Sequence, residues 1–329
     1  EESIKLEKAY VLTPQNLRVV DNTAATMKLS LDAPSSSTTD VNDNFEQYEA
    51  WGTSFGAWTT VDNDHGFAGN LVDGAQYNHQ GEAFAFINWE PADIFEGADS
   101  NVLPHSGEKA AAAIYQVDNM GNDYIDADNW LISPQLSGKA QTIHFWVNNL
   151  PSQDGSYGTE RFDVLTSMTN NEIAAFKKVG DTHVQGSGKW TEVAVTVPEG
   201  TKFFAIHHIT KKDNVFVFMV DDATFESGTG PILYNIYRDG TYVGKTYTTL
   251  SNEIANDGQN HQYSVTAVYA DGTESEPVML TVTTGIQNVD GTSPVTYDVY
   301  TLDGKQVLKA ARSLQKLAKG IYVINGKKT

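Results

Sequence analysis

Acidic side chains gather at three places in the sequence and could bind a divalent cation. Carboxylate and backbone carbonyl oxygens are the ligands that calcium prefers, and the ion takes about six to eight of them. The clusters lie near both ends of one long stretch of chain, which begins near residue 38 and ends near residue 228. The candidate calcium ligands are Asp43, Glu46, Asp62, Asp64, Asp221 and Asp222.

A strand pairing between the two ends of this stretch would bring acids from both ends together. Glu46 would then approach Asp221 or Asp222, and such carboxylates repel one another unless a divalent cation neutralises them. Alternation along a strand turns Asp221 and Asp222 to opposite faces, and we expect Asp222 to be the ligand or acceptor on the buried side unless a bulge reverses the order. The alternative interpretation is that these acids are solvated turn residues.

A further acidic segment, 118–128, could also bind calcium. It lacks the spacing and the terminal Glu of an EF-hand loop. We therefore interpret it as a surface loop that leads into a strand at Trp130.

The sequence carries little that indicates catalysis. The H-E-x-x-H, P-loop and G-x-G-x-x-G motifs do not occur, and we expect no catalytic nucleophile. His207 and His208 are adjacent, so on a strand they point to opposite faces and cannot chelate one ion together. A pair of carboxylates for glycoside hydrolysis needs only two acids at a suitable spacing in a cleft, and that alternative stays open. The aromatic residues that could stack on a sugar, which we interpret as core, are Trp51, Trp58, Trp89 and Tyr77.

Composition narrows the possible partners and the location. The chain has 42 Asp and Glu against 22 Lys and Arg, a net charge of −20, which would repel nucleic acid. There is no Cys, so disulfides, thiolate zinc sites and thiol nucleophiles are excluded. The sequence has no run of 18 or more apolar residues, so it predicts no transmembrane helix. The charge argues against non-specific clustering, and we expect a monomer, although a specific dimer is permitted.

The hydrophobic pattern has a period of two along most of the chain and predicts an all-β protein. Segments 191–197 and 263–269 alternate polar with apolar or β-branched residues, which is typical of half-buried strands. Asp-Gly pairs at 239–240 and 271–272 favour tight turns between antiparallel strands. Two segments have modest helical periodicity, and both would be short: 109–116 and 172–178.

Residues 38–228 resemble the cleaved-adhesin, or choice-of-anchor J, family. The resemblance rests on motifs such as Asn-Phe-Glu at 44–46, Asp-Asn-Trp-Leu-Ile-Ser-Pro at 128–134 and Val-Asp-Asp-Ala-Thr-Phe at 220–225. Similar domains occur in the haemagglutinin regions of gingipain-type surface proteases and in secreted Bacteroidetes proteins. The resemblance implies a jelly-roll β-sandwich related to MAM and galactose-binding modules, with calcium sites.

Two further resemblances flank this region. Segments 8–34 and 229–284 are similar to the strands of a fibronectin type III domain, which predicts that the jelly roll is inserted into, or lies next to, that domain. The alternative is that the N-terminal segment forms an independent arm. Residues 286–329 are similar to the C-terminal sorting domain of type IX secretion, a small β-sandwich; the alternative is a plain hairpin module.

These observations predict a secreted or outer-surface adhesin-type binding protein. It would be stabilised by calcium, recognise host protein or carbohydrate, and perform no chemistry. A secreted hydrolase with a carboxylate pair and a purely structural accessory module are the alternatives. A deep acidic groove flanked by aromatic residues would favour the hydrolase, whereas a flat face would favour binding.

Overall fold

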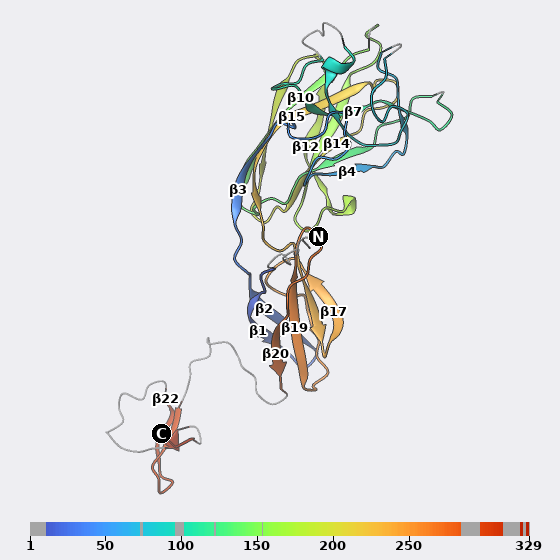
Figure 1. Ribbon diagram of the computed structural model, residues 1–329. Helices are drawn as coiled ribbons and strands as arrows, with labels where there is room; N and C mark the ends of the chain where they lie inside the picture. The colour runs from blue at the N-terminus through green and yellow to red at the C-terminus, as the bar shows by residue number, and fades with distance from the viewer. Residues whose placement is uncertain are drawn as a thin grey trace, which may run out of the picture. The chain divides into compact units, whose positions relative to one another are not determined.

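The computed structural model describes residues 11–72, 75–95, 102–121, 123–152, 154–283, 297–311, 323–324 and 327–328 (Figure 1). The chain divides into two compact units. The larger is centred on residues 34–234, and the smaller combines 14–33 with 235–266 and the chain from 277 onward. Each unit is built from β-strands, so the prediction of an all-β fold is confirmed.

The larger unit is a jelly-roll sandwich of two antiparallel sheets. The first has the order β13-β10-β15-β7-β6, and β3 also pairs with β15. Its strands are β3 (Thr38–Asp43), β6 (Ile87–Trp89), β7 (Ala110–Ile114), β10 (Gln141–Leu150), β13 (Thr191–Val197) and β15 (Val217–Gly228). The second has the order β12-β11-β14-β9-β4, formed by β4 (Thr59–Asp62), β9 (Asn129–Ile132), β11 (Glu160–Ser167), β12 (Lys177–Gln185) and β14 (Phe203–His208).

The first and last strands of this unit lie side by side, which is the condition under which acids from the two ends come together. β3 pairs with β15 from Asp43↔Ala223 to Thr38↔Gly228, and Figure 1 shows the two strands together at the edge of the sheet. Smaller elements complete the unit: β5 (Phe67–Ala68), β8 (Gln116–Val117) and the 3-10 turns η1 (Pro91–Asp93) and η2 (Ile173–Ala175).

The main core fills the space between the two sheets. Phe145 of β10 lies across from Phe162 of β11 and Phe204 of β14, with ring centroids 6.5 and 6.4 Å apart. Inward residues alternate with outward ones along each strand, so Ile143, Phe145 and Val147 are buried while Thr142 is exposed. Burial of these large side chains stabilises the sandwich.

A second apolar cluster covers the outer face of β6 and β7. Ala111 and Ala113 face the main core, whereas Ala112 and Ile114 face this second cluster with Trp89. Both faces of β7 are therefore buried, and small side chains let the layers approach. The helix expected at 109–116 is wrong because the alanines are used as a doubly buried strand, so tertiary packing overrides their helical propensity.

The second expected helix, at 172–178, is reduced to the single 3-10 turn η2 before β12 begins at Lys177. Phe176 is buried in a third apolar cluster on the outer face of the second sheet, with Trp130 and Leu165. The segment is therefore held by that contact, and not by a helical face.

The smaller unit contains two facing groups of strands. One sheet has the order β1-β2-β18, from β1 (Gln15–Asn22), β2 (Thr26–Asp32) and β18 (Ile254–Ala255). The other has the order β17-β16-β19-β20, from β16 (Leu233–Arg238), β17 (Thr241–Thr246), β19 (His261–Val268) and β20 (Val278–Val282). β2 pairs with β18 through Met27↔Ile254, so N-terminal strands complete a sheet with residues that follow the larger unit.

The C-terminal strands form a separate small sheet of order β22-β21-β23-β24: β21 (Tyr297–Tyr300), β22 (Gln306–Ala311), β23 (Val323–Ile324) and β24 (Lys327–Lys328). Much of the segment that resembles a sorting domain, including 286–296 and 312–322, lies outside the described residues. The fibronectin-like and sorting-domain assignments, with their boundaries, stay predictions. Within the described residues, helices long and apolar enough to cross a membrane are absent.

The doubly buried strand β7 leads to a prediction about packing. Ala112→Leu adds a large side chain where both faces are closed, and we expect it to lower the free energy of unfolding by about 1–3 kcal/mol. Ala194→Leu, at an exposed position of β13 in the same sheet, is the matched control and should change it by less than about 0.5 kcal/mol. Urea unfolding measures both; equal effects would contradict burial of Ala112.

Candidate functional site

Asp221 of β15 is fully buried and holds the beginning of the loop 105–109. Its Oδ2 accepts hydrogen bonds from the backbone N–H groups of His105 (2.9 Å) and Ser106 (3.1 Å). Burial, together with the nearby charge of Asp222, raises the pKa of Asp221 to about 8. Without a compensating cation, the raised pKa favours the protonated form of Asp221 near neutral pH.

A β-bulge decides which of the two aspartates is buried. Between the pairs His144↔Thr224 and Trp146↔Asp221, β15 has one residue more than β10, and Asp222 takes a φ of 46°. The expectation that Asp222 is the buried one is therefore wrong, because the bulge turns Asp221 under the loop and leaves the Asp222 side chain 19% exposed.

Asp222 binds the same loop from the outside. Its Oδ1 accepts a hydrogen bond from Ser106 Oγ (2.8 Å), and its Oδ2 lies 2.5 Å from His105 Nδ1. The His105 ring stacks on Trp146 of β10 with centroids 3.9 Å apart. One short loop thus contacts both adjacent carboxylates.

Glu46 holds the other end of this loop. Its Oε1 accepts hydrogen bonds from the backbone N–H groups of Glu108 (2.8 Å) and Lys109 (2.7 Å). Gly107 lies between the two anchored ends with a φ of 63°, and a Cβ there would lie 2.3 Å from Glu46 Oε1. A glycine is required at this position both by the left-handed backbone and by the carboxylate against it.

The site has the donor type that calcium prefers. Glu46, Asp221 and Asp222 bring hard carboxylate oxygens to one loop, and Glu46 Oε2 has no hydrogen-bond partner among the described residues. However, within the described ranges no group of three or more His, Cys, Asp or Glu side chains is arranged to hold a metal ion. Backbone carbonyl oxygens of the loop would have to complete a coordination shell.

Asp43 is held by protein donors. Its carboxylate accepts hydrogen bonds from Tyr48 Oη (2.6 Å), Trp58 Nε1 (2.8 Å), the Phe45 backbone N–H (3.0 Å) and Gln47 Nε2 (3.3 Å). Both oxygens are thus used at the end of β3. Its role in this arrangement is to fix the turn that follows the first strand of the sandwich.

Asp62 and Asp64 lie together on the other sheet, at the end of β4. Asp62 Oδ1 accepts the His65 N–H, and Asp64 Oδ2 accepts the backbone N–H of Asp128 (2.8 Å) and Nδ2 of Asn129 (2.9 Å). Burial raises the pKa of Asp64, and the charge of Asp62 adds to the effect. These two acids belong to a cluster separate from the loop 105–109, with partners from the segment 118–128.

The adjacent histidines point to opposite faces of β14, as predicted. His207 stacks on Trp130 at 3.9 Å, and its Nε2 contacts Asp128 Oδ1 (2.7 Å). His208 is fully buried, and its Nε2 contacts Glu160 Oε2 (2.8 Å). Each therefore has a carboxylate partner of its own, and the two do not share an ion.

The aromatic residues considered as a sugar platform are buried in the two apolar clusters, as the core interpretation predicts: Trp51, Trp58, Trp89 and Tyr77 are each at most 7% exposed.

One catalytic motif is missing from the motifs considered above: residues 52–56 match G-x-S-x-G. The motif lies in the loop between β3 and β4, with Ser54 exposed and Phe55 buried. A nucleophile elbow requires a strand, a sharp turn and a helix, so this match has no catalytic setting.

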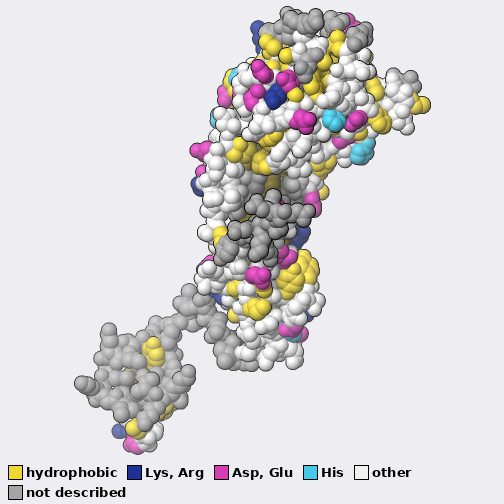
Figure 2. All heavy atoms as spheres, viewed as in Figure 1, with side chains coloured by type: hydrophobic (Ala, Val, Ile, Leu, Met, Phe, Trp, Pro, Cys, Tyr) yellow, Lys and Arg dark blue, Asp and Glu magenta, His cyan; other side chains and the backbone are white. Residues whose placement is uncertain are grey.

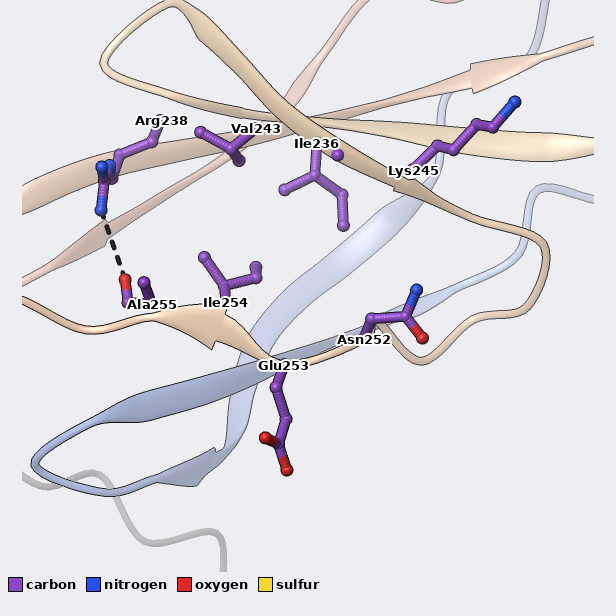
Figure 3. Close-up of a pocket in the computed structure, with 9 residues that line it drawn as sticks. Ile236, Arg238, Val243, Lys245, Asn252, Glu253, Ile254 and Ala255 are labelled. Atoms are coloured by element: carbon purple, nitrogen blue, oxygen red, sulfur yellow. Dashed lines mark hydrogen bonds between the residues drawn. The ribbon is translucent and has the colours of Figure 1, made fainter.

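The smaller unit has a hollow of about 330 Å³ between β16–β17 and β18 (Figure 3). Ile236, Val243 and Ile254 point into it, and Arg238 donates a hydrogen bond to the Ala255 carbonyl at one end. Glu253 is the single carboxylate of its lining. This hollow therefore does not supply the pair of acids that glycoside hydrolysis requires.

Acidic side chains are distributed over the visible surface of the molecule, with few basic ones among them (Figure 2). This distribution agrees with the net charge of −20. A large negative field disfavours anionic ligands across most of the surface.

A known family model matches part of the larger unit. Residues 94–225 match the family model described as Cleaved Adhesin Domain. The matched range includes the loop 105–109 and both Asp221 and Asp222, whereas Glu46 lies before it. The resemblance to cleaved adhesins is therefore supported for this region, and the flanking domains are not covered by it.

Characterised relatives come from Porphyromonas gingivalis. The chain is 30% identical to haemagglutinin A over 194 residues, which cover 52% of this chain and 9% of that protein. It is 29% identical to Lys-gingipain W83 over 194 residues, or 52% of this chain and 11% of that protein. The chain thus spans about a tenth of the length of these relatives, and it is similar to a region of each.

Two solved structures are similar to part of the chain. The K3 cleaved adhesin domain of Lys-gingipain is 22% identical, with a TM-score of 0.39, over 58% of this chain and 99% of that domain. The K2 domain is 20% identical, with a TM-score of 0.41, over 57% and 99%. At these scores the likeness carries no argument about function.

Because the pKa of Asp221 is raised by burial, we expect the free energy of unfolding to depend on pH. The unfolded chain releases this proton near the ordinary value of 3.8, whereas the folded chain retains it to about 8. Between these values the folded state binds more protons, so without calcium the free energy of unfolding falls as pH rises, on the order of 1.4 kcal/mol for each pH unit. Asp221→Asn removes the titrating group, and urea unfolding in chelator at pH 5 and 7.5 should show a smaller loss. Equal losses in both proteins would contradict the raised pKa.

Proposed function

We propose that this chain is a secreted or outer-surface adhesin-type binding protein that recognises host protein or glycan and performs no chemistry. The observation that carries the proposal is the match of residues 94–225 to the Cleaved Adhesin Domain. The similarity to a region of haemagglutinin A supports a role in attachment, since that relative is named for binding to red cells.

The proposal extends to the flanking segments. Residues 8–34 and 229–284 would form a fibronectin type III-like domain that is split by the jelly roll, and 286–329 would be a sorting-type domain. The pairing of β2 with β18 supports the first assignment, because it joins N-terminal and later residues in one sheet.

Calcium would stabilise the larger unit at the loop 105–109. Glu46 and Asp222 would hold the ion with backbone oxygens of the loop, and Asp221 would ionise beside it. Two features support this placement. Glu46 Oε2 has no hydrogen-bond partner among the described residues, and Asp221 is buried beside Asp222, where a cation would offset the cost of ionising it. A bound calcium ion would supply a structural cross-link between the ends of the sandwich.

Thermal unfolding tests the calcium site. Because only the folded state would bind the ion, calcium at about 100 times its Kd should stabilise by about 2.7 kcal/mol and raise Tm by roughly 5–10 °C over chelator. Glu46→Gln and Asp222→Asn should each abolish most of the rise. Glu199→Gln, at an exposed position without a hydrogen-bond partner among the described residues, is the matched control and should keep it. An unchanged Tm in the parent protein would refute calcium binding.

Binding of the labelled chain to erythrocytes, and to immobilised host matrix proteins, tests the adhesin function. We expect saturable binding that decreases in chelator, since loss of the ion would loosen the loop 105–109. Flow cytometry and surface binding assays provide the measurement. Absence of saturable binding to both would favour the structural accessory module.

A further inference from the structure

The outer face of β13, and of β10 as far as Trp146, is the part of the first sheet that the second apolar cluster leaves open. The beginning of β15 is covered, because Val217 and Met219 belong to that cluster. Along β10 the inward residues Ile143, Phe145 and Val147 belong to the core, so Thr142, His144 and Trp146 point outward. On β13, Glu192 and Thr196 are exposed on the same side, because Trp146 pairs with Glu192 and Thr142 with Thr196. We name this surface the open face.

An aromatic wall stands at one end of the open face. Trp146 is half-buried there under the ring of His105, and Trp190 meets that ring edge-on with centroids 5.8 Å apart. Trp190 Nε1 donates a hydrogen bond to the carbonyl of Leu103 (3.0 Å), a residue that is 44% exposed. Aromatic and apolar atoms are thus grouped on a sheet face that is otherwise polar, and the contacts fix their positions.

Beyond the wall, the open face carries paired polar groups. His144 Nδ1 lies 2.9 Å from Glu192 Oε1, and both side chains are more than 40% exposed. Thr142 and Thr196 share a hydrogen bond of 3.2 Å. Hydroxyl, imidazole and carboxylate groups supply both donors and acceptors in neighbouring rows of the sheet, at the strand spacing of about 4.8 Å.

The chemistry of this face matches a neutral saccharide. A sugar ring presents an apolar C–H face that suits an aromatic side chain, and its hydroxyl groups both donate and accept hydrogen bonds. Anionic ligands are disfavoured, because the face carries Glu192 and Asp222 in a chain with a net charge of −20.

We propose that the open face binds a neutral glycan. The ring of His105, supported by Trp146 and flanked by Trp190, would stack against a sugar ring, and the His144–Glu192 pair would bond its hydroxyl groups. The inference rests on the proposed adhesin function and names its ligand class and its surface. The glycan surface differs from the proposed calcium site at Glu46, Asp221 and Asp222, although His105 contacts residues of both.

Affinity electrophoresis of the full chain in native gels tests this site. The gels contain galactan, mannan or xyloglucan as neutral probes and heparin as an anionic probe, all with calcium present. Trp146→Ala removes the ring on which His105 is stacked, and His144→Ala removes an exposed polar contact that does not support the core. Tyr157→Ala is the control, since Tyr157 is half-buried in an aromatic cluster with Tyr124. Circular dichroism confirms that each variant is folded.

We expect at least one neutral polysaccharide to retard the parent chain and Tyr157→Ala, and both open-face variants to bind it about tenfold more weakly. Retardation by heparin alone, no retardation in any neutral gel, or retardation that both open-face variants retain would overturn the proposal. Erythrocyte or matrix-protein binding that persists in those cases would leave the adhesin function standing with a protein ligand.

Discussion

The larger unit depends on the attachment of one loop to carboxylates from both ends of its chain. Glu46 follows the first strand, Asp221 and Asp222 belong to the last, and all three contact residues 105–109. This arrangement requires the pairing of β3 with β15, because that pairing brings the two ends together. The loop in turn places His105 over Trp146, so the shape of the open face follows from the same contacts.

The first sheet divides its outer face between two roles. At β6 and β7 it is covered by a second apolar cluster that includes Trp89 and Ile114, so burial there adds stability. At β10 and β13 the same face is polar and accessible, with exposed Glu192 and Thr196. The loop 105–109 lies at the boundary between these two parts, which is where an aromatic wall can be both supported by a core and open to solvent.

A period of two predicts the strands and the opposite orientation of His207 and His208. The pairing of the first and last strands is what the resemblance to a jelly roll implies. The acidic clusters of the sequence include Glu46, Asp221 and Asp222, which are the three acids that contact the loop 105–109. The sequence does not predict the bulge at Asp222, because the alternation of residue types along a strand does not show where an extra residue is inserted. It also misses the strand Ala110–Ile114, where alanines favour a helix locally. It does not identify the N–H groups that bind Glu46, because every residue except proline carries a backbone donor.

The central claim is that the carboxylates around residues 105–109 form one cation site, and the calcium content of the purified chain tests it most directly. The chain would be treated with chelator, dialysed against a buffer with a defined low calcium concentration, and analysed by inductively coupled plasma mass spectrometry. The account predicts about one retained calcium ion per chain in the parent protein, and loss of that ion in Glu46→Gln. A parent chain that retains none, or a variant that retains as much as the parent, would contradict it.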